Sequence, residues 1–164
     1  MGEANASTLA TAINPVTGNT YYLLESDSWT ASQAEAVLLG GNLVTVNDQA
    51  ENDWVFSTFA DSGTRNLWIG LNDALVEGEF VWVSGENAAY RNWASPEPNN
   101  HFGLEDYVQF YSFQYGNAWN DAQNDGMGTF GAIYGVVEVA AIPEPSTALL
   151  MAIGMAWLGM RRRS

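Results

Sequence analysis

The sequence predicts an α+β fold in which two helices accompany short strands and one long polar loop. Two helix starts occur in the first half of the chain, and strand-like apolar runs follow from residue 67 onward. Residues 84–106 are rich in Asn, Pro, Glu and Gly and show little periodicity. A loop of that length inside a domain is usually functional or disordered. With 164 residues, nearly half of them hydrophobic, the chain can form one domain with a core.

The first strand and helix are predicted from local signals. Turn residues at 14–19 precede a β-prone segment at 20–24. Thr30 and Gln33 have the spacing of a capping box, which predicts that a helix begins there. The expected buried face of this helix consists of Ala34, Val37 and Leu38.

Gly40-Gly41 is expected to end this helix, and residues 43–46 are expected to form a short strand. Asp48 and Glu51 resemble a second helix start, for a helix that stops near residues 62–63. Its predicted buried residues are Trp54, Val55 and Phe59. Further strands are predicted at residues 67–71, 80–83, 107–110 and 134–139.

The chain is strongly acidic, with 19 acids, five arginines and no lysine. Through residue 142 there are 18 acids against two arginines. Such a domain repels phosphate backbones and anionic lipid headgroups, so nucleic acid is not expected as a partner. The absence of cysteine excludes disulfides and thiol catalysis.

Oxygen donors gather in the second half of the chain. Glu97-Pro98-Asn99 is followed by Glu105-Asp106 and then by Trp119-Asn120-Asp121. Calcium takes roughly 6–8 oxygen ligands at about 2.3–2.6 Å, and it can leave positions open for an outside ligand. These residues therefore predict a calcium-dependent binding site.

Catalysis has little support in the sequence. His101 is the only histidine, and no serine lies in a Gly-x-Ser-x-Gly motif. Two of the acids could imitate a glycosidase pair, but their alternation with amides fits a metal site better. We expect no enzymatic activity.

The order of the predicted elements, with Trp68-Ile69-Gly70-Leu71 at their centre and the three acid–amide motifs after it, resembles the C-type lectin-like domain over residues 14–139. This resemblance implies two helices that flank small antiparallel sheets and a long calcium-binding loop. The positions that match the principal calcium ligands of the family are Glu97, Asn99, Glu105, Asn120 and Asp121. The first four would also contact two neighbouring sugar hydroxyls.

The same resemblance implies sugar specificity and a second ion. The order Glu97-Pro98-Asn99 implies mannose- or glucose-type sugars, and Pro98 would follow a cis peptide bond. An auxiliary calcium site is implied at Asp73, Glu77, Asn100 and Asp106, with Glu105 shared. The alternative is that Asp73 and Glu77 are solvated turn residues. Residues 110–115 and 125–131 are expected to form extra loops whose aromatic side chains either stack on a sugar or pack beneath the loop.

The C-terminal segment has a different character. Pro143-Glu144-Pro145 precedes a 14-residue, mostly apolar run at 147–160 and three arginines. The run is shorter than the about 20 residues that a comfortable bilayer span needs. The order of the three parts resembles the PEP-CTERM sorting tail, which implies recognition by an exosortase, a transient inner-membrane anchor, and delivery to the surface or extracellular matrix of a Gram-negative bacterium. An ordinary anchor or a buried helix is the alternative.

These observations predict a flexible N-terminus at 1–13, a lectin-like domain at 14–140 and a sorting tail at 141–164. Since residues 1–12 lack the features of a signal peptide, we expect the true start to lie upstream. The predicted function is an exported, calcium-dependent carbohydrate-binding module. The alternative is a structural or adhesive matrix protein that binds protein partners and uses calcium only for stability.

Overall fold

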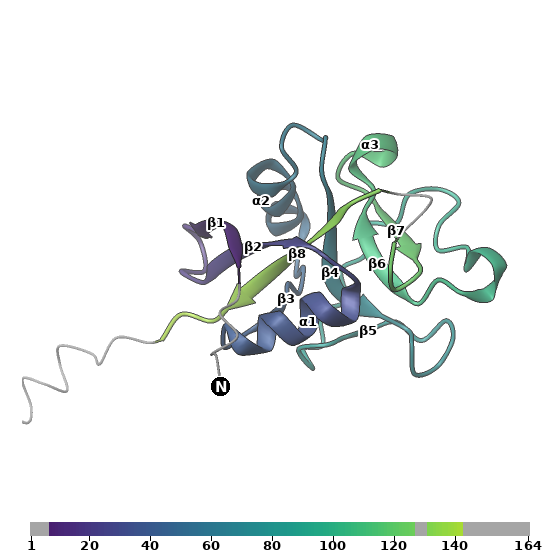
Figure 1. Ribbon diagram of the computed structural model, residues 1–164, viewed down its shortest axis with the longest axis horizontal. Helices are drawn as coiled ribbons and strands as arrows, with labels where there is room; N and C mark the ends of the chain where they lie inside the picture. The colour runs from purple at the N-terminus through teal and green to yellow at the C-terminus, as the bar shows by residue number, and fades with distance from the viewer. Residues whose placement is uncertain (1–6, 127–130, 143–164) are drawn as a thin grey trace, which may run out of the picture.

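The computed structural model describes residues 7–126 and 131–142 and confirms the α+β class (Figure 1). The strands join in the order β1-β2-β8-β4-β6-β7, while β3 pairs with β8 and β5 with β4. Most neighbours are antiparallel, but β4 and β8 run parallel. The strands are β1 Thr8–Ile13, β2 Thr20–Ser26, β3 Asn42–Leu43, β4 Asn66–Asn72, β5 Val81–Trp82, β6 Tyr107–Phe110, β7 Trp119–Ala122 and β8 Ile133–Val139. The helices are α1 Trp29–Leu38, α2 Gln49–Phe59 and the short α3 Ser112–Tyr115, with a 3-10 turn at His101–Gly103.

Strand β4 is the centre of the core and contains the Trp-Ile-Gly-Leu sequence. Trp68, Ile69 and Leu71 are fully buried in it. Gly70 permits the close approach of the neighbouring chain, because a Cβ atom there would lie 2.4 Å from the carbonyl oxygen of Leu43. The motif therefore combines large buried side chains with one position that has no room for a side chain.

Helix α1 begins earlier than predicted and buries a different face. The side chain of Ser28, not that of Thr30, caps the helix by accepting a hydrogen bond from the Ala31 amide at 3.3 Å. Trp29 then fixes the rotation of the helix, since its Nε1 donates to the Ile69 carbonyl at 2.7 Å. The buried residues are Trp29, Ser32 and Ala36, whereas Ala34, Val37 and Leu38 are exposed.

Helix α2 begins as predicted. Asp48 caps it by accepting a hydrogen bond from the Glu51 amide at 2.9 Å. Val55 and Phe59 are buried and Trp54 is partly buried. The helix ends at Phe59, before the predicted stop, and Asp61 and Ser62 then adopt positive φ angles of 47° and 58°.

The N-terminal expectation is wrong for residues 8–13. These residues form β1, which pairs with β2 in antiparallel register from Thr8↔Leu24 to Ile13↔Thr20. The strand is almost entirely exposed, so backbone pairing rather than burial holds it in place. Sequence patterning did not reveal the strand because none of its residues is fully buried.

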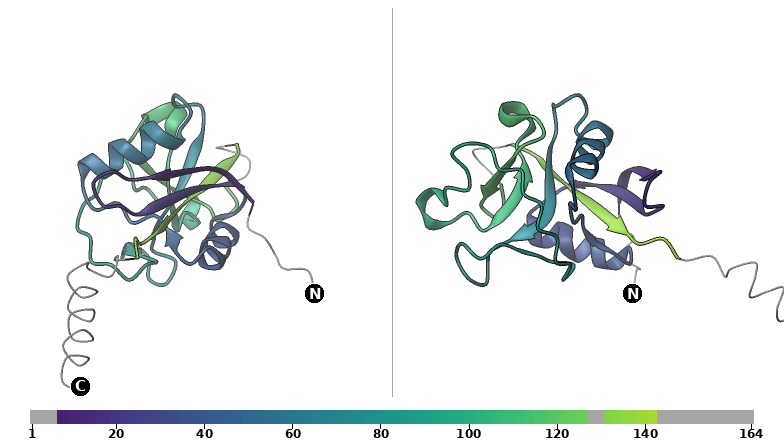
Figure 2. Two further views of the ribbon diagram at one scale, coloured as in Figure 1. Left: turned by 90° about the vertical axis from the view of Figure 1, so that its left-hand side faces the viewer. Right: turned by 180° about the vertical axis from the view of Figure 1, so that it is seen from behind.

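The long loop is tied to the core by backbone hydrogen bonds. Trp119 donates its amide proton to the Asn92 carbonyl at 2.8 Å and accepts from the Ala94 amide at 2.9 Å. The peptide bonds Ser95-Pro96 and Glu97-Pro98 are cis. Residues 112–115, predicted as loop, form α3 beside this segment (Figure 2).

The predicted sorting motif Pro143, Glu144 and Pro145 and the apolar run after it lie outside the described residues. In the part of the chain that the structure describes, no helix combines the length and apolar character that a bilayer crossing requires.

Candidate functional site

A cavity of about 270 Å³ lies between the long loop and the β7–α3 region. We call it the loop cavity. Its lining includes four residues of the predicted principal site, namely Glu97, Asn99, Glu105 and Asn120. The structure thus places these four residues around one space, although their role as metal ligands stays a prediction.

Strand β7 positions the far wall of the loop cavity. Trp119 is fully buried, and its Nε1 donates to Asn52 Oδ1 on α2 at 2.8 Å. It also packs edge-on against Trp82, with ring centroids 5.9 Å apart. The next residue, Asn120, pairs with Gln109 of β6. The tryptophan of the Trp-Asn-Asp motif therefore fixes the strand that presents the two polar residues.

Asp121 lies beneath the loop and is fully buried. Its Oδ1 accepts a hydrogen bond from the Asn99 amide at 3.2 Å, and its Oδ2 accepts from the Asn100 amide at 2.7 Å. The Asn120 side-chain amide contacts the Asp121 carbonyl oxygen. The Asp121 carboxylate therefore holds the Pro98–Asn100 segment against β7.

Glu105 closes the other side of the loop. Its Oε2 accepts a hydrogen bond from the His101 amide at 2.8 Å, and its own amide donates to Asn100 Oδ1 at 3.1 Å. Burial raises the pKa of the Glu105 carboxyl above its ordinary value, and the nearby Asp121 charge adds to the rise. These side-chain to backbone bonds shape the loop in a chain without disulfides.

The two carboxylate oxygens of Glu97 differ in their partners. Its Oε1 accepts a hydrogen bond from the Tyr115 hydroxyl at 3.3 Å, but its Oε2 is buried and has no partner among the described residues. Burial raises the pKa of this carboxyl, and the negative charge of Asp121 raises it further. A buried carboxylate oxygen without a donor is costly, and a bound cation would satisfy it.

Asp73, predicted for the auxiliary site, resembles Glu97 in this respect. Its Oδ2 accepts from the Gly78 amide at 2.8 Å, whereas its buried Oδ1 has no partner within the described segments. Burial raises its pKa, and the charges of Asp106 and Asp121 act in the same direction. Its amide also donates to the Asp106 carbonyl at 3.0 Å. Glu77 is exposed.

Carboxylates and histidine alone do not form a metal site. Within residues 7–126 and 131–142, no three Asp, Glu or His side chains converge closely enough to hold an ion. The predicted principal set also needs the amide oxygens of Asn99 and Asn120. The carboxylates of Asp121 and Glu105 already accept backbone amides, so an ion there would share or replace those contacts.

Aromatic side chains form part of the lining of the loop cavity. Tyr111 and Tyr115 line it from the α3 side, and His101 and Phe102 line it from the 3-10 turn. Phe102 is 82% exposed and has a positive φ of 60°, which is unusual for a large side chain. The sequence predicted that aromatic side chains of residues 110–115, which include Tyr111 and Tyr115, would lie at the site. It gave no reason to expect Phe102 there.

Sequence comparison places this geometry in a known family. Residues 25–127 match the family described as "Lectin C-type domain". The chain belongs to the C-type lectin domain family. Its fold and Trp-Ile-Gly-Leu strand agree with the predicted resemblance, and the family makes it a lectin-type binding module and not an enzyme. Residues 141–163 match the PEP-CTERM protein-sorting motif.

Two curated relatives show the extent of the likeness. The low affinity immunoglobulin epsilon Fc receptor of Mus musculus is 35% identical over 102 residues, which cover 62% of this chain and 29% of the receptor. Lectin BRA-3 of Megabalanus rosa is 35% identical over 103 residues, which cover 63% of this chain and 60% of that lectin. The chain therefore matches only a part of each of these proteins.

Solved structures agree on the fold. The cow carbohydrate-recognition domain of CD23, crystallised in the presence of the GlcNAc2Man3 oligosaccharide, has a TM-score of 0.66 at 26% identity, with coverage of 85% of this chain and 100% of that domain. The C-type lectin CEL-I from Cucumaria echinata has a TM-score of 0.65 at 26% identity, covering 84% of this chain and 97% of CEL-I.

Proposed function

We propose that this chain is an exported lectin that binds mannose- or glucose-type sugars through a calcium ion in the loop cavity. The observation that carries the proposal is the buried Oε2 atom of Glu97, which has no partner among the described residues and lies in a cavity that Asn99, Glu105 and Asn120 also line. The proposed ligands are these four residues and the buried Asp121. All of them offer oxygen, which calcium prefers.

The arrangement of acids and amides supports a fixed sugar orientation. A bound calcium ion would supply the positive charge to which two neighbouring sugar hydroxyls coordinate. The amides of Asn99 and Asn120 can donate hydrogen bonds to those hydroxyls, and the carboxylates of Glu97 and Glu105 can accept from them. A sugar whose hydroxyls point differently would leave some of these groups unpaired.

The auxiliary site is proposed at Asp73, Glu77, Asn100 and Asp106, with Glu105 shared. It is supported by the buried Oδ1 of Asp73, which lacks a partner in the part of the chain that the structure describes, and by the hydrogen bond from the Asp73 amide to the Asp106 carbonyl. An ion there would brace the base of the same loop. Its expected role is therefore structural, with no sugar contact.

The sorting motif supports a proposal for where the protein is located. Because residues 141–163 match the PEP-CTERM motif, we infer export, processing by an exosortase, a transient membrane anchor, and a final location at the surface or in the matrix of a Gram-negative bacterium. A single lectin site of this type binds weakly, and several copies on one surface would provide useful avidity.

The test is binding to immobilised mannose with calcium and with a chelator. Retention that requires calcium and is blocked by free mannose supports the proposal. The double variant Glu97→Gln with Asn99→Asp exchanges acid and amide and should shift the preference toward galactose. Glu79→Gln with Asn87→Asp makes the same exchange at exposed positions outside the cavity and should not change the preference.

A different outcome would favour the structural reading. If calcium raised the melting temperature but no sugar on a glycan array bound, the ion would serve only to hold the loops. The proposal of a lectin site would then be wrong, even though the predicted metal site remained.

A further inference from the structure

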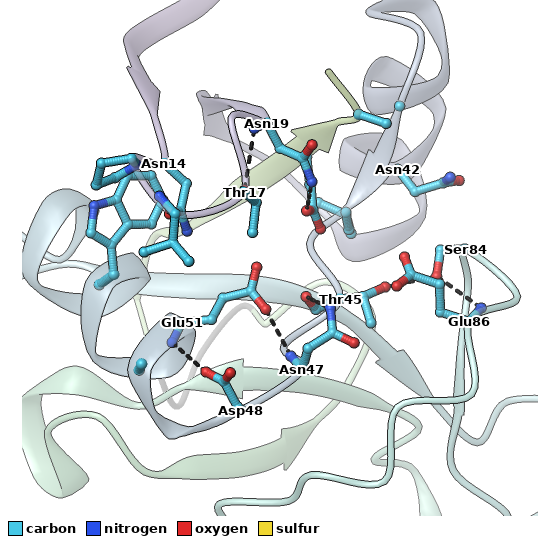
Figure 3. A pocket seen from close by; sticks show the side chains of 18 of the residues that line it. Asn14, Thr17, Asn19, Asn42, Thr45, Asn47, Asp48, Glu51, Ser84 and Glu86 are labelled. Atoms are coloured by element: carbon cyan, nitrogen blue, oxygen red, sulfur yellow. Dashed lines mark hydrogen bonds between the residues drawn. The ribbon is translucent and has the colours of Figure 1, made fainter. Parts of the chain in front are cut away.

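A second and larger cavity, of about 700 Å³, lies in another part of the domain, and Figure 3 shows its lining. We call it the hairpin cavity, because the loop between β1 and β2 forms one of its walls. The start of α2, the turn before β3, residues 84–86 and the end of β8 form the others. It shares no lining residue with the loop cavity. Its volume is within the about 300–1,000 Å³ that is usual for small-molecule sites.

Polar side chains point into the hairpin cavity from opposite sides. Figure 3 shows Thr17 and Asn19 on one side and Asn47 and Glu51 on the other. The Thr17 hydroxyl accepts a hydrogen bond from the Asn19 amide at 3.2 Å and keeps its own hydrogen to donate. The cavity therefore presents donors as well as acceptors.

Glu51 is a buried hydrogen-bond acceptor in the wall of the cavity, with 7% of its surface exposed. Its Oε2 accepts from the Asn47 amide at 2.8 Å, and its Oε1 lies 2.5 Å from the Tyr21 hydroxyl. The same hydroxyl lies 2.8 Å from Glu138 Oε1. Glu138 Oε1 also accepts a hydrogen bond from the Asn19 side-chain amide at 2.7 Å. Since a hydroxyl has one hydrogen, Tyr21 can donate to only one of the two carboxylates. When it donates to Glu138, Glu51 Oε1 can accept a hydrogen bond from a ligand.

One side of the cavity is apolar. Trp54 and Pro15 line it, and the Trp54 ring is held edge-on against Tyr21 with centroids 4.8 Å apart. A ring with an apolar face and polar edges suits such a mixed lining. All charged side chains in the described lining are acidic, which excludes an anionic ligand.

We propose that the hairpin cavity is a second binding site, independent of calcium, for a neutral saccharide of about one or two rings. Each sugar hydroxyl is both a donor and an acceptor, which matches the mixture of amide, hydroxyl and carboxylate groups around the cavity. The apolar face of a sugar ring packs against Trp54. The site goes beyond the proposed calcium-dependent function and does not depend on it.

The test uses the full chain and saturation-transfer NMR with a panel of neutral disaccharides (mannobiose, cellobiose, chitobiose and lactose), each with calcium and with EDTA. At least one disaccharide should give a signal that persists in EDTA. The variant Glu97→Gln, measured in calcium, should show the same residual signal. Because this variant weakens binding at the loop cavity without a chelator, it controls for any effect of EDTA on folding.

Ala50 on α2 is exposed and lines the hairpin cavity, so Ala50→Trp should fill the space. We expect it to lower the EDTA-resistant affinity at least about tenfold and to leave calcium-dependent binding unchanged. Ala34→Trp, on the exposed side of α1 and outside the lining, is the matched control. Thr17→Val removes one hydroxyl and should weaken the same signal several-fold.

Two results would overturn the proposal. One is the absence of any EDTA-resistant signal across the panel, and the other is a resistant signal that Ala50→Trp leaves intact. Failure of the calcium-dependent signal alone would count against the loop cavity and not against this one.

Discussion

The two cavities of this domain are built in opposite ways. All residues that line the loop cavity come from positions 97–126, and a buried carboxylate oxygen of Glu97 has no protein partner there within the described residues. The hairpin cavity draws on segments between residues 14 and 140, and its buried polar residues Asn14, Thr45 and Glu51 all make hydrogen bonds. The loop cavity thus contains a buried carboxylate oxygen without a partner among the described residues, whereas the buried polar residues that line the hairpin cavity are hydrogen-bonded. This difference is why we propose an ion for the loop cavity only.

The largest effect is expected from Glu97→Gln, which removes a charge at the proposed ion. Calcium-dependent mannose affinity should fall about 100-fold, since truncating one partner of a buried charged contact costs about 2–5 kcal/mol. Titration calorimetry in calcium measures this loss. If EDTA-resistant disaccharide binding fell equally, the two cavities would not be independent and the comparison would fail.

An intermediate effect is expected from Glu138→Gln in the hairpin cavity. Burial raises the pKa of the Glu138 carboxyl, and the charges of Glu51 and Glu86 add to this. A raised folded-state pKa means that the contribution of Glu138 to stability is present below its ordinary pKa of about 4.5 and is lost as the pH rises through the folded value.

The glutamine variant has no such charge, so its melting temperature should exceed that of the wild type at pH 7, and the gap should narrow as the pH falls toward the ordinary carboxyl range. Thermal melts in EDTA across pH measure the difference and leave out any calcium effect. A gap that widened on acidification would contradict this account of Glu138.

The smallest effect is expected from Tyr115→Phe in the loop cavity. The change removes the hydroxyl that donates to Glu97 Oε1 but keeps the ring. Calcium-dependent affinity should fall about 2- to 10-fold, because a single hydrogen bond contributes about 0.5–1.5 kcal/mol. Tyr115→Ala should weaken binding further if the ring contacts the sugar. Equal affinities of the two variants would show that the ring contributes nothing to sugar binding beyond its hydroxyl.

The sequence predicted the structure correctly where the deciding residues lie close together in a short motif. The Trp-Ile-Gly-Leu strand was placed correctly because its residues fill the core and its glycine allows a close approach. Glu97, Asn99 and Glu105 were grouped in advance because they occur within nine consecutive residues of one loop. Asn120 was grouped with them only because its position matches the family's motif. The structure brings it there through the pairing of β7 with β6, and β7 was not among the predicted strands.

The errors arose where distant contacts decide the outcome. Helix α1 turns a different face to the core because Trp29 is fixed by the Ile69 carbonyl, and no local pattern shows that bond. Strand β1 exists through its pairing with β2 and lacks a buried face. The hairpin cavity was missed for the same reason, since its lining comes from segments that are far apart in the sequence.

The position of β2 between β1 and β8 affects how the domain can be attached to other structures. The first strand, β1, and the last strand, β8, pair with opposite edges of β2, while β6 and β7 and the long loop lie at the other end of the sheet order (Figure 1). The two terminal strands of the described chain thus lie at the part of the sheet order away from β6, β7 and the long loop. The domain can therefore be tethered through either terminal strand with its loop cavity left accessible.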